Sequence, residues 1–235
     1  MIEIKQYRNE WKYILTDAKL EAIDFKLKTI MSSDSNAKSD GKYVIHSLYF
    51  DDIYDACMRD NDQGLSQRYK YRIRYYDDDI SYIRLERKEK LQERCYKESC
   101  LLTREQYAKI LEEDYFDVFW STENKLLRAF CVCCVTKGLR PKAIIEYERR
   151  AYIEPATNVR ITLDTNISAS YEVEEFLQGT YAKFPLQEKK MQVLEAKFDY
   201  ILPSYIRHVI TDEELVRTSF SKYCLGRKQL RRKGL

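Results

Sequence analysis

The sequence contains few glycines, prolines and histidines, and each shortage argues against a class of site. Six glycines and four prolines occur among the 235 residues. No glycines take the spacing of GxGxxG or GxxxxGK[ST], so neither a dinucleotide-binding site nor a P-loop is expected. Two histidines, His46 and His208, make a histidine-based zinc site or a histidine-dependent triad improbable. If the protein binds phosphate, it must therefore do so with other side chains.

Long apolar runs are missing as well. The longest strongly apolar stretch, Ala129 to Val135, has about seven residues, whereas roughly 20 are needed to cross a bilayer. The N-terminus has no apolar segment of the kind found in secretory signals. The seven cysteines are odd in number and accompany no export signal, which is typical of reduced thiols. We therefore expect a cytoplasmic protein with no transmembrane segment, which would associate with a membrane only through a partner.

Charged residues are plentiful, but the two signs nearly cancel. The chain has 41 Lys and Arg against 38 Asp and Glu, a net charge of +3, which does not argue for nucleic acid. A short basic C-terminal tail from about residue 227, RKQLRRKGL, is the only support for a nucleic-acid binder, and a solvated terminus explains it more simply. Because no repeat, linker or change in composition divides the chain, we predict a single domain over residues 1–235.

The hydrophobic pattern predicts an α+β fold that is rich in antiparallel strands and has helices outside. Strands are predicted at residues 1–15, 43–50, 68–76, 80–90, 94–101, 142–153, 159–164 and 191–198. A helix capped by Thr16 is predicted to run to about Met31, and Thr103 with Gln106 forms a capping box for a helix to about Glu113. Further helices are predicted at residues 53–59 and 123–136, and one more is expected to begin at Pro203.

Charged side chains recur on one alternating face of several predicted strands. Examples are Lys70, Arg72 and Arg74 in one strand and Arg84, Glu86 and Lys88 in the next. The simpler interpretation is a single sheet with one solvated face. The alternative is a closed β-barrel whose lumen these side chains line. Such a lumen needs anions, which a phosphate chain would supply, and its few carboxylates would suit a divalent metal.

Eight short motifs decide between these interpretations. They are RNEWKY (8–13), SLYFD (47–51), YRIRYY (71–76), RLERK (84–88), YERRAY (147–152), VRITLDTNI (159–167), LEAKF (194–198) and SFSKY (219–223). Together and in this order, they resemble the VTC domain, the polyphosphate polymerase family of the triphosphate tunnel metalloenzyme (CYTH-like) superfamily. The resemblance covers nearly the whole chain. It implies an antiparallel β-barrel, the triphosphate tunnel, with helices packed outside.

The resemblance also implies a function and a set of site residues. The expected reaction transfers the γ-phosphate of ATP to a growing polyphosphate chain and releases ADP. The expected phosphate- and nucleotide-binding residues are Lys12, Arg72, Arg74, Lys88, Lys97, Tyr147, Arg149, Arg160, Lys197 and Lys222, among which Arg72, Arg74, Lys88, Arg149 and Arg160 are the catalytic candidates. Glu195 matches the glutamate that holds Mn²⁺ or Mg²⁺, and Glu10 and Glu86 are further candidates for that role.

Some positions leave alternatives open. Alternation alone would choose Glu146, Glu148 and Arg150 as the polar face of their strand, whereas the motif selects Tyr147 and Arg149. Arg8 stands where hydrolytic tunnel enzymes carry the first glutamate of ExExK, which weakens a hydrolase interpretation. Ser99 and Ser219 replace basic residues of the polymerase pattern, so the tunnel is expected to be less positive. A metal-dependent triphosphatase and a non-catalytic polyphosphate- or nucleotide-binding module remain the alternatives to a polymerase.

Overall fold

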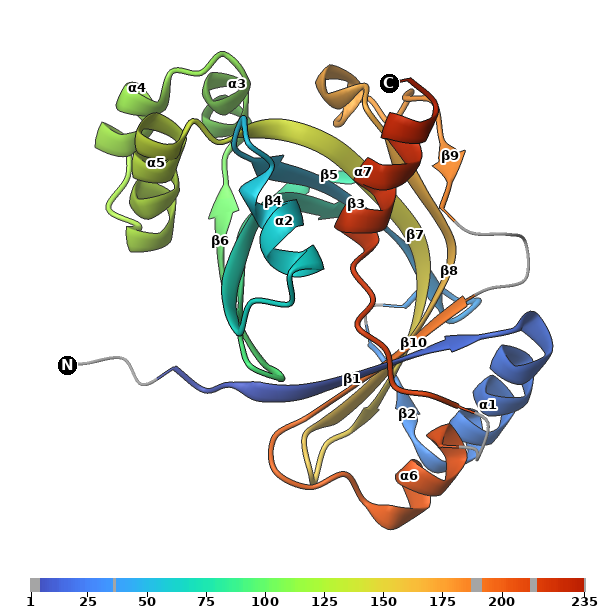
Figure 1. Cartoon of the computed structure of the whole chain (residues 1–235). Coiled ribbons are helices and arrows are strands. Elements are labelled where there is room, and N and C mark those ends of the chain that lie inside the picture. The colour runs from blue at the N-terminus through green and yellow to red at the C-terminus, as the bar shows by residue number, and fades with distance from the viewer. Residues whose placement is uncertain (1–4, 36, 187–191, 212–214, 235) are drawn as a thin grey trace.

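The strands form one large antiparallel sheet that closes into a ring (Figure 1). The computed structural model describes residues 5–35, 37–186, 192–211 and 215–234. Around the ring the strands follow the order β7-β3-β4-β5-β6-β1-β10-β8, and the pairing of β8 with β7 closes it. The strands are β1 (Arg8–Leu15), β2 (Ser32–Ser33), β3 (Lys42–Asp51), β4 (Gln67–Tyr76), β5 (Asp79–Leu91), β6 (Arg94–Leu102), β7 (Arg140–Glu154), β8 (Val159–Ser170), β9 (Phe184–Pro185) and β10 (Gln192–Phe198).

The ring is weakest where β6 meets β1. These strands share only two register pairs, Arg8 with Cys95 and Asn9 with Arg94, whereas β7 and β8 pair along most of their length. Past this point β1 keeps β10 as its partner on one edge. On the other edge, the backbone N–H of Thr218 donates to the carbonyl of Lys12 at 2.9 Å. The segment before the last helix therefore continues the wall of the ring.

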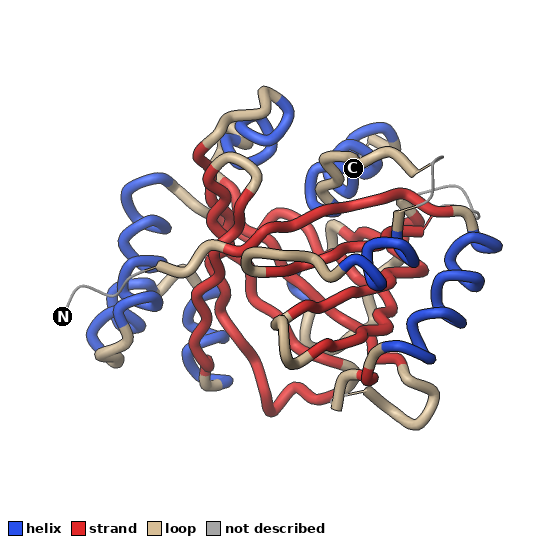
Figure 2. The backbone as a smooth tube through the Cα atoms, turned by 90° about the horizontal axis from the view of Figure 1, so that it is seen from below, coloured by secondary structure: helices blue, strands red, loops and turns tan. Residues whose placement is uncertain are grey.

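Helices cover the outside of the ring in two groups (Figure 2). Helices α3 (Arg104–Leu111), α4 (Tyr115–Trp120) and α5 (Lys125–Lys137) share one apolar core with the outer faces of β3 to β6. Helices α1 (Asp17–Ile30) and α6 (Ser204–Ile210) share a second core with β1, β8 and β10. Two outer cores thus leave the inner face of the ring available for polar side chains.

A third apolar cluster lies on the inner face of the ring, where α7 (Lys222–Arg232) and α2 (Ala56–Asp62) pack against β3, β7 and β8. Figure 1 shows α7 lying across the ring. A side-chain atom at Gly226 would come within 2.4 Å of Ile145 Cδ1, so the absence of a side chain allows this close approach. Arg227 and Arg231 form ion pairs with Asp55. Residues 227–232 therefore form the end of a packed helix, which differs from the solvated basic tail expected from sequence.

The observed elements confirm the predicted α+β fold class and most of the predicted elements. Thr16 caps α1, and the capping box of Thr103 and Gln106 has both of its hydrogen bonds. Gly138 ends α5 in the left-handed conformation at φ 64°. The sequence analysis did not predict α4 or α7, and it ended β8 six residues too early. None of the described helices has the length and apolar composition needed to cross a membrane.

Candidate active site

The ring encloses a cavity of about 570 Å³ whose wall is dominated by cations. Only two carboxylates, Glu10 and Glu195, are among the lining residues of the described chain. Because like charges at this density repel one another, such a cavity favours a ligand with several negative charges. The thirteen basic lining residues are Arg8, Lys12, Arg68, Lys70, Arg72, Arg74, Lys88, Lys90, Lys97, Arg149, Arg160, Lys197 and Lys222.

Arg72 and Arg74 on β4 are held in place by a carboxylate on the neighbouring strand. Arg72 pairs with Glu86 across β4 and β5, and its Nε donates to Glu86 Oε2 at 2.8 Å. Lys97 Nζ donates to the other oxygen at 3.0 Å. Burial would raise the pKa of Glu86, but Arg74, Arg72 and Lys97 hold it well below its usual range. Glu86 therefore stays ionised and fixes the orientation of the two guanidinium groups.

Arg149 on β7 is fixed in the same way on the opposite wall. Its Nε and Nη2 donate to the two oxygens of Asp164 at 2.6 and 2.8 Å, which is a bidentate pair. Lys222 Nζ also donates to Asp164, at 2.5 Å. Asp164 is fully buried, and although burial would raise its pKa, Arg149 and Lys222 lower it. The C-terminal segment thus contributes one cation of the cavity directly.

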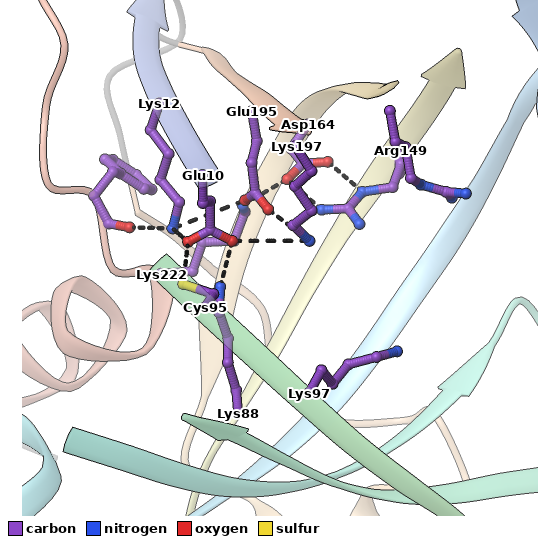
Figure 3. Close-up of polar contacts among 12 residues, drawn as sticks. Glu10, Lys12, Lys88, Cys95, Lys97, Arg149, Asp164, Glu195, Lys197 and Lys222 are labelled. Atoms are coloured by element: carbon purple, nitrogen blue, oxygen red, sulfur yellow. Dashed lines mark hydrogen bonds and ion pairs between the residues drawn. The ribbon is translucent and has the colours of Figure 1, made fainter. Parts of the chain in front are cut away.

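Glu10 and Glu195 lie side by side among three lysines (Figure 3). Lys88 Nζ donates to Glu10 at 2.5 Å, and Lys197 lies 2.8 Å from Glu195. Burial and the neighbouring Glu195 would raise the pKa of Glu10, but Lys12, Lys88 and Lys197 lower it to about 2. Burial likewise opposes ionisation of Glu195, while Lys197, Lys12 and Lys88 hold its pKa well below the usual range. Both groups are therefore carboxylates at neutral pH.

These two carboxylates are suited to a metal ion only together with a ligand. No group of three or more His, Cys, Asp or Glu side chains in the described ranges could hold a metal by itself. Mg²⁺, however, commonly takes one or two carboxylates and completes its shell with waters and substrate phosphates. Glu195 and Glu10 face a cavity built for anions, so the donor set fits a metal that arrives with phosphate.

The structure brings almost all of the expected site residues to one cavity. Lys12, Arg72, Arg74, Lys88, Lys97, Tyr147, Arg149, Arg160, Lys197, Lys222, Glu10 and Glu195 all line it. Glu86 differs from the expectation for a metal ligand, because it is fully buried behind Arg72, Arg74 and Lys97 and is not part of the lining. On β7, Tyr147 and Arg149 line the cavity, whereas the alternation argument had selected Glu146, Glu148 and Arg150.

Several lining residues were missed by the sequence analysis. Lys70, noted on the charged face of its strand but not among the expected site residues, lines the cavity, and Arg68 and Lys90 extend the charged faces of β4 and β5. Attention to parity along the full strands would have found Arg68 and Lys90 as well. Tyr43 and Tyr49 on β3 gave no such signal, because aromatic residues in a strand are usually assigned to the core.

Comparison with known proteins identifies the family. The family model of the VTC domain matches residues 7–231. The chain belongs to the VTC-domain family. This confirms the family predicted from the eight motifs. No curated protein sequence gives a significant match.

Two solved structures have a similar fold. One is a proposed adenylate cyclase from Bacillus halodurans, with 11% sequence identity, a TM-score of 0.51 and coverage of 87% of this chain and 84% of that chain. The other is a proposed adenylyl cyclase from Hippeastrum, described as having a dominant triphosphatase activity. It shows 12% identity and a TM-score of 0.54, covering 94% of this VTC-domain chain and 95% of that chain. At these identities, the likeness concerns the fold.

Proposed function

We propose that this VTC-domain protein is an ATP-dependent polyphosphate polymerase. The observation that carries the proposal is the closed ring of strands, whose cavity presents thirteen cations against two carboxylates. A phosphate chain has its negative charges in a line, and Arg and Lys bind its oxygens by charge-assisted hydrogen bonds. ATP as phosphate donor fits the cytoplasmic location predicted from the sequence, and the same cavity would hold the polyphosphate product.

The reaction needs alignment and charge neutralisation more than covalent help from the protein. A terminal oxygen of the chain attacks the γ-phosphorus of ATP, and the bond from that phosphorus to the ADP oxygen breaks. Arg72, Arg74 and Arg149 offset the charge on the transferred phosphate, because their guanidinium groups are already fixed by Glu86 and Asp164. The attacking oxygen is already anionic, so no side chain has to act as a nucleophile.

Glu195 and Glu10 complete the site. They would hold the divalent metal, Mn²⁺ or Mg²⁺, whose charge offsets that of the phosphates when it is bound. The lysines around them, Lys12, Lys88 and Lys197, would bind phosphate oxygens that the metal does not reach.

The second candidate is a metal-dependent triphosphatase, in which water takes the place of the phosphate chain. The triphosphatase activity described for the Hippeastrum protein of similar fold favours this alternative. A third candidate is a binding module without catalysis. The two ionised carboxylates in the cavity argue against it, because they weaken the binding of a polyanion unless a metal joins them.

One incubation separates the three functions. The protein is mixed with ATP and Mn²⁺, and nucleotides, free phosphate and phosphate chains are resolved. Long chains with ADP support the polymerase, free phosphate with ADP supports the triphosphatase, and unchanged ATP supports the module. Arg74→Ala should abolish the products, whereas the matched surface variant Arg104→Ala should not, since Arg104 is exposed on α3. Equal activity in both variants would reject this cavity as the site.

A further inference from the structure

Two hydroxyl groups on the inner face of β3 accept hydrogen bonds from the two arginines of β4. Tyr49 is paired with Arg72 in the strand register, and Arg72 Nη1 donates to the Tyr49 hydroxyl oxygen at 2.8 Å. Ser47 is paired with Arg74, whose Nε donates to Ser47 Oγ at 3.1 Å. β3 therefore positions the same guanidinium groups that Glu86 holds from the other side.

Tyr49 differs from Ser47 because its hydroxyl can ionise. Its side chain is 8% exposed and lines the cavity, and its ring stacks on Tyr223 of α7 with centroids 5.0 Å apart. The charged groups around it are Lys70, Arg72 and Arg74 on β4, with Glu86 of β5 behind the arginines. The other titratable side chains of its apolar cluster are Tyr43 of β3, Tyr76 of β4, Tyr147 of β7, Tyr223 and Cys224 of α7, and Cys57 of α2. Asp51 of β3 accepts a hydrogen bond from Tyr223.

The cations around Tyr49 favour its ionised form. Burial would raise the pKa of Tyr49, but Arg72, Arg74 and Lys70 lower it to about 8. Burial raises the pKa of Tyr223 and of Cys57, so these neighbours stay neutral where Tyr49 ionises. A neutral phenol can accept from Arg72 and still donate its own hydrogen to a phosphate oxygen. A phenolate has no hydrogen to donate, and it offsets one of the positive charges that a phosphate would use.

We propose that Tyr49 is a positioning residue that adjusts the charge of the Arg72–Arg74 pair, and that the cavity binds a phosphate chain with Tyr49 in its protonated form. The proposal rests on the phosphate-binding function proposed above. Binding of the chain then takes up a proton when the free protein carries the phenolate. By linkage, affinity falls as the pH rises through the ionisation of Tyr49.

The test compares the pH dependence of ATP binding in wild type and Tyr49→Phe. Calorimetry in the presence of EDTA, from about pH 7 to about pH 9.5, gives the Kd and the number of protons taken up. In wild type, the Kd should rise above pH 8, approaching tenfold per pH unit, with up to about one proton taken up. In Tyr49→Phe, this rise of the Kd and the accompanying proton uptake should be absent, because phenylalanine cannot ionise. The ionisation of ATP itself is the same in both proteins and cancels in the comparison.

Tyr43→Phe is the matched control. Tyr43 is also on the inner face of β3, and its hydroxyl accepts from Arg160 Nη2 at 2.9 Å. Burial raises its pKa, so it stays neutral across this range and the variant should keep the wild-type slope. Tyr76 is tested in parallel as Tyr76→Phe, because burial would raise its pKa but Arg74 lowers it. If the rise of the Kd with pH persists in Tyr49→Phe but disappears in Tyr76→Phe, the assignment to Tyr49 would be overturned.

A spectroscopic titration supports the test if Tyr49→Phe folds poorly. Tyrosinate absorbance of the wild-type protein should report one ionisation near pH 8, which moves to higher pH when ATP saturates the cavity. An ionisation that ATP does not move, or none near pH 8, would overturn the proposal. Absence of ATP binding at every pH would reject the proposed function itself, and the linkage with it. Binding with equal slopes in wild type and Tyr49→Phe would reject the Tyr49 proposal alone.

Discussion

Buried carboxylates fix the arginines of the cavity before any ligand binds: Glu86 holds Arg72 and Arg74, and Asp164 holds Arg149. Glu86 and Asp164 are fully buried, and each contacts at least two cations. Leaving a buried charge without its partner costs about 3–5 kcal/mol, so the cations and carboxylates hold one another in place. A phosphate therefore meets donors that need little reorganisation, which is the condition for strong electrostatic stabilisation of a transferred phosphate.

The first residue-scale prediction concerns Glu195. Glu195→Gln keeps the shape of the side chain but removes its charge. We expect loss of Mn²⁺-dependent turnover, with metal-free ATP binding unchanged or tighter because one negative charge has left the cavity. Calorimetry in EDTA and a product assay with Mn²⁺ measure the two effects separately. Glu123→Gln is the control, since the Glu123 side chain is 91% exposed. Full activity of Glu195→Gln would show that Glu195 is not needed to hold a metal.

The opposite behaviour is expected of Arg74. Arg74→Ala removes a guanidinium group that is 4% exposed and lies beside Ser47, Tyr147 and Glu86. We expect metal-free ATP binding to weaken by about 1.5–3 kcal/mol, the usual contribution of a hydrogen bond to a charged group. Calorimetry in EDTA measures this loss of binding free energy in Arg74→Ala, with Arg104→Ala as the control. If Glu195→Gln weakens binding as much as Arg74→Ala does, the division between phosphate-binding and metal-binding residues is wrong.

At the scale of elements, β7 shows why alternation alone chose the wrong face. Its outward residues are the charged ones: Glu146 pairs with Lys183, Glu148 with Lys42, and Arg150 with Asp24. Its inward face is mixed, because one end packs against α7 and the other lines the cavity. A strand whose polar face is outside and whose inner face carries Tyr147 and Arg149 cannot be oriented by counting polar residues. Only the motif identified the inner face.

The C-terminal helix gives the element-scale prediction. Leu230 is 2% exposed and belongs to the inner apolar cluster, so α7 is bound by packing and not only by its charges. Leu230→Ala should lower the free energy of unfolding by about 2–5 kcal/mol, as for other buried leucines. Arg232→Ala, at an exposed position two residues later, should change it by less than about 0.5 kcal/mol. Denaturant unfolding measures both. Equal, small effects would mean that residues 227–232 behave as a solvated tail.

For the whole molecule, the sequence allowed the fold class, the family and most of the strands to be predicted. Strand alternation and capping residues are local signals, so they located β4, β5, α1 and α3. The closure of the ring depends on long-range pairs such as Arg149 with Asp164, which no local pattern reveals. The positions of Tyr43 and Tyr49 in the site were missed because each acts through a partner on another strand.

Several carboxyl groups of the ring have a lowered pKa and should contribute to its stability in acid, and two of them lie on different parts of the ring. Glu10 of β1 pairs with Lys88 of β5, and Glu146 of β7 accepts from Tyr181 at 2.7 Å and Lys183 at 2.6 Å. Burial would raise the pKa of Glu146, but His46, Lys183 and Tyr181 lower it to about 2, the same value as for Glu10. Each group therefore binds its proton more weakly in the folded state than in the unfolded state.

Linkage gives the sign of the effect. A carboxyl whose pKa is lowered by folding contributes stability above its unfolded pKa of 4.5, and this stability is lost as the pH falls towards about 2. We expect the free energy of unfolding, measured with denaturant, to fall steeply below about pH 4.5. Glu146→Gln should be less stable than wild type at pH 6 and should show a shallower fall, because one of the titrating groups is gone. Because Glu146 lies outside the cavity, ATP binding at pH 7 should be unchanged in this variant. A Glu146→Gln curve parallel to that of wild type would mean that Glu146 does not contribute to acid unfolding.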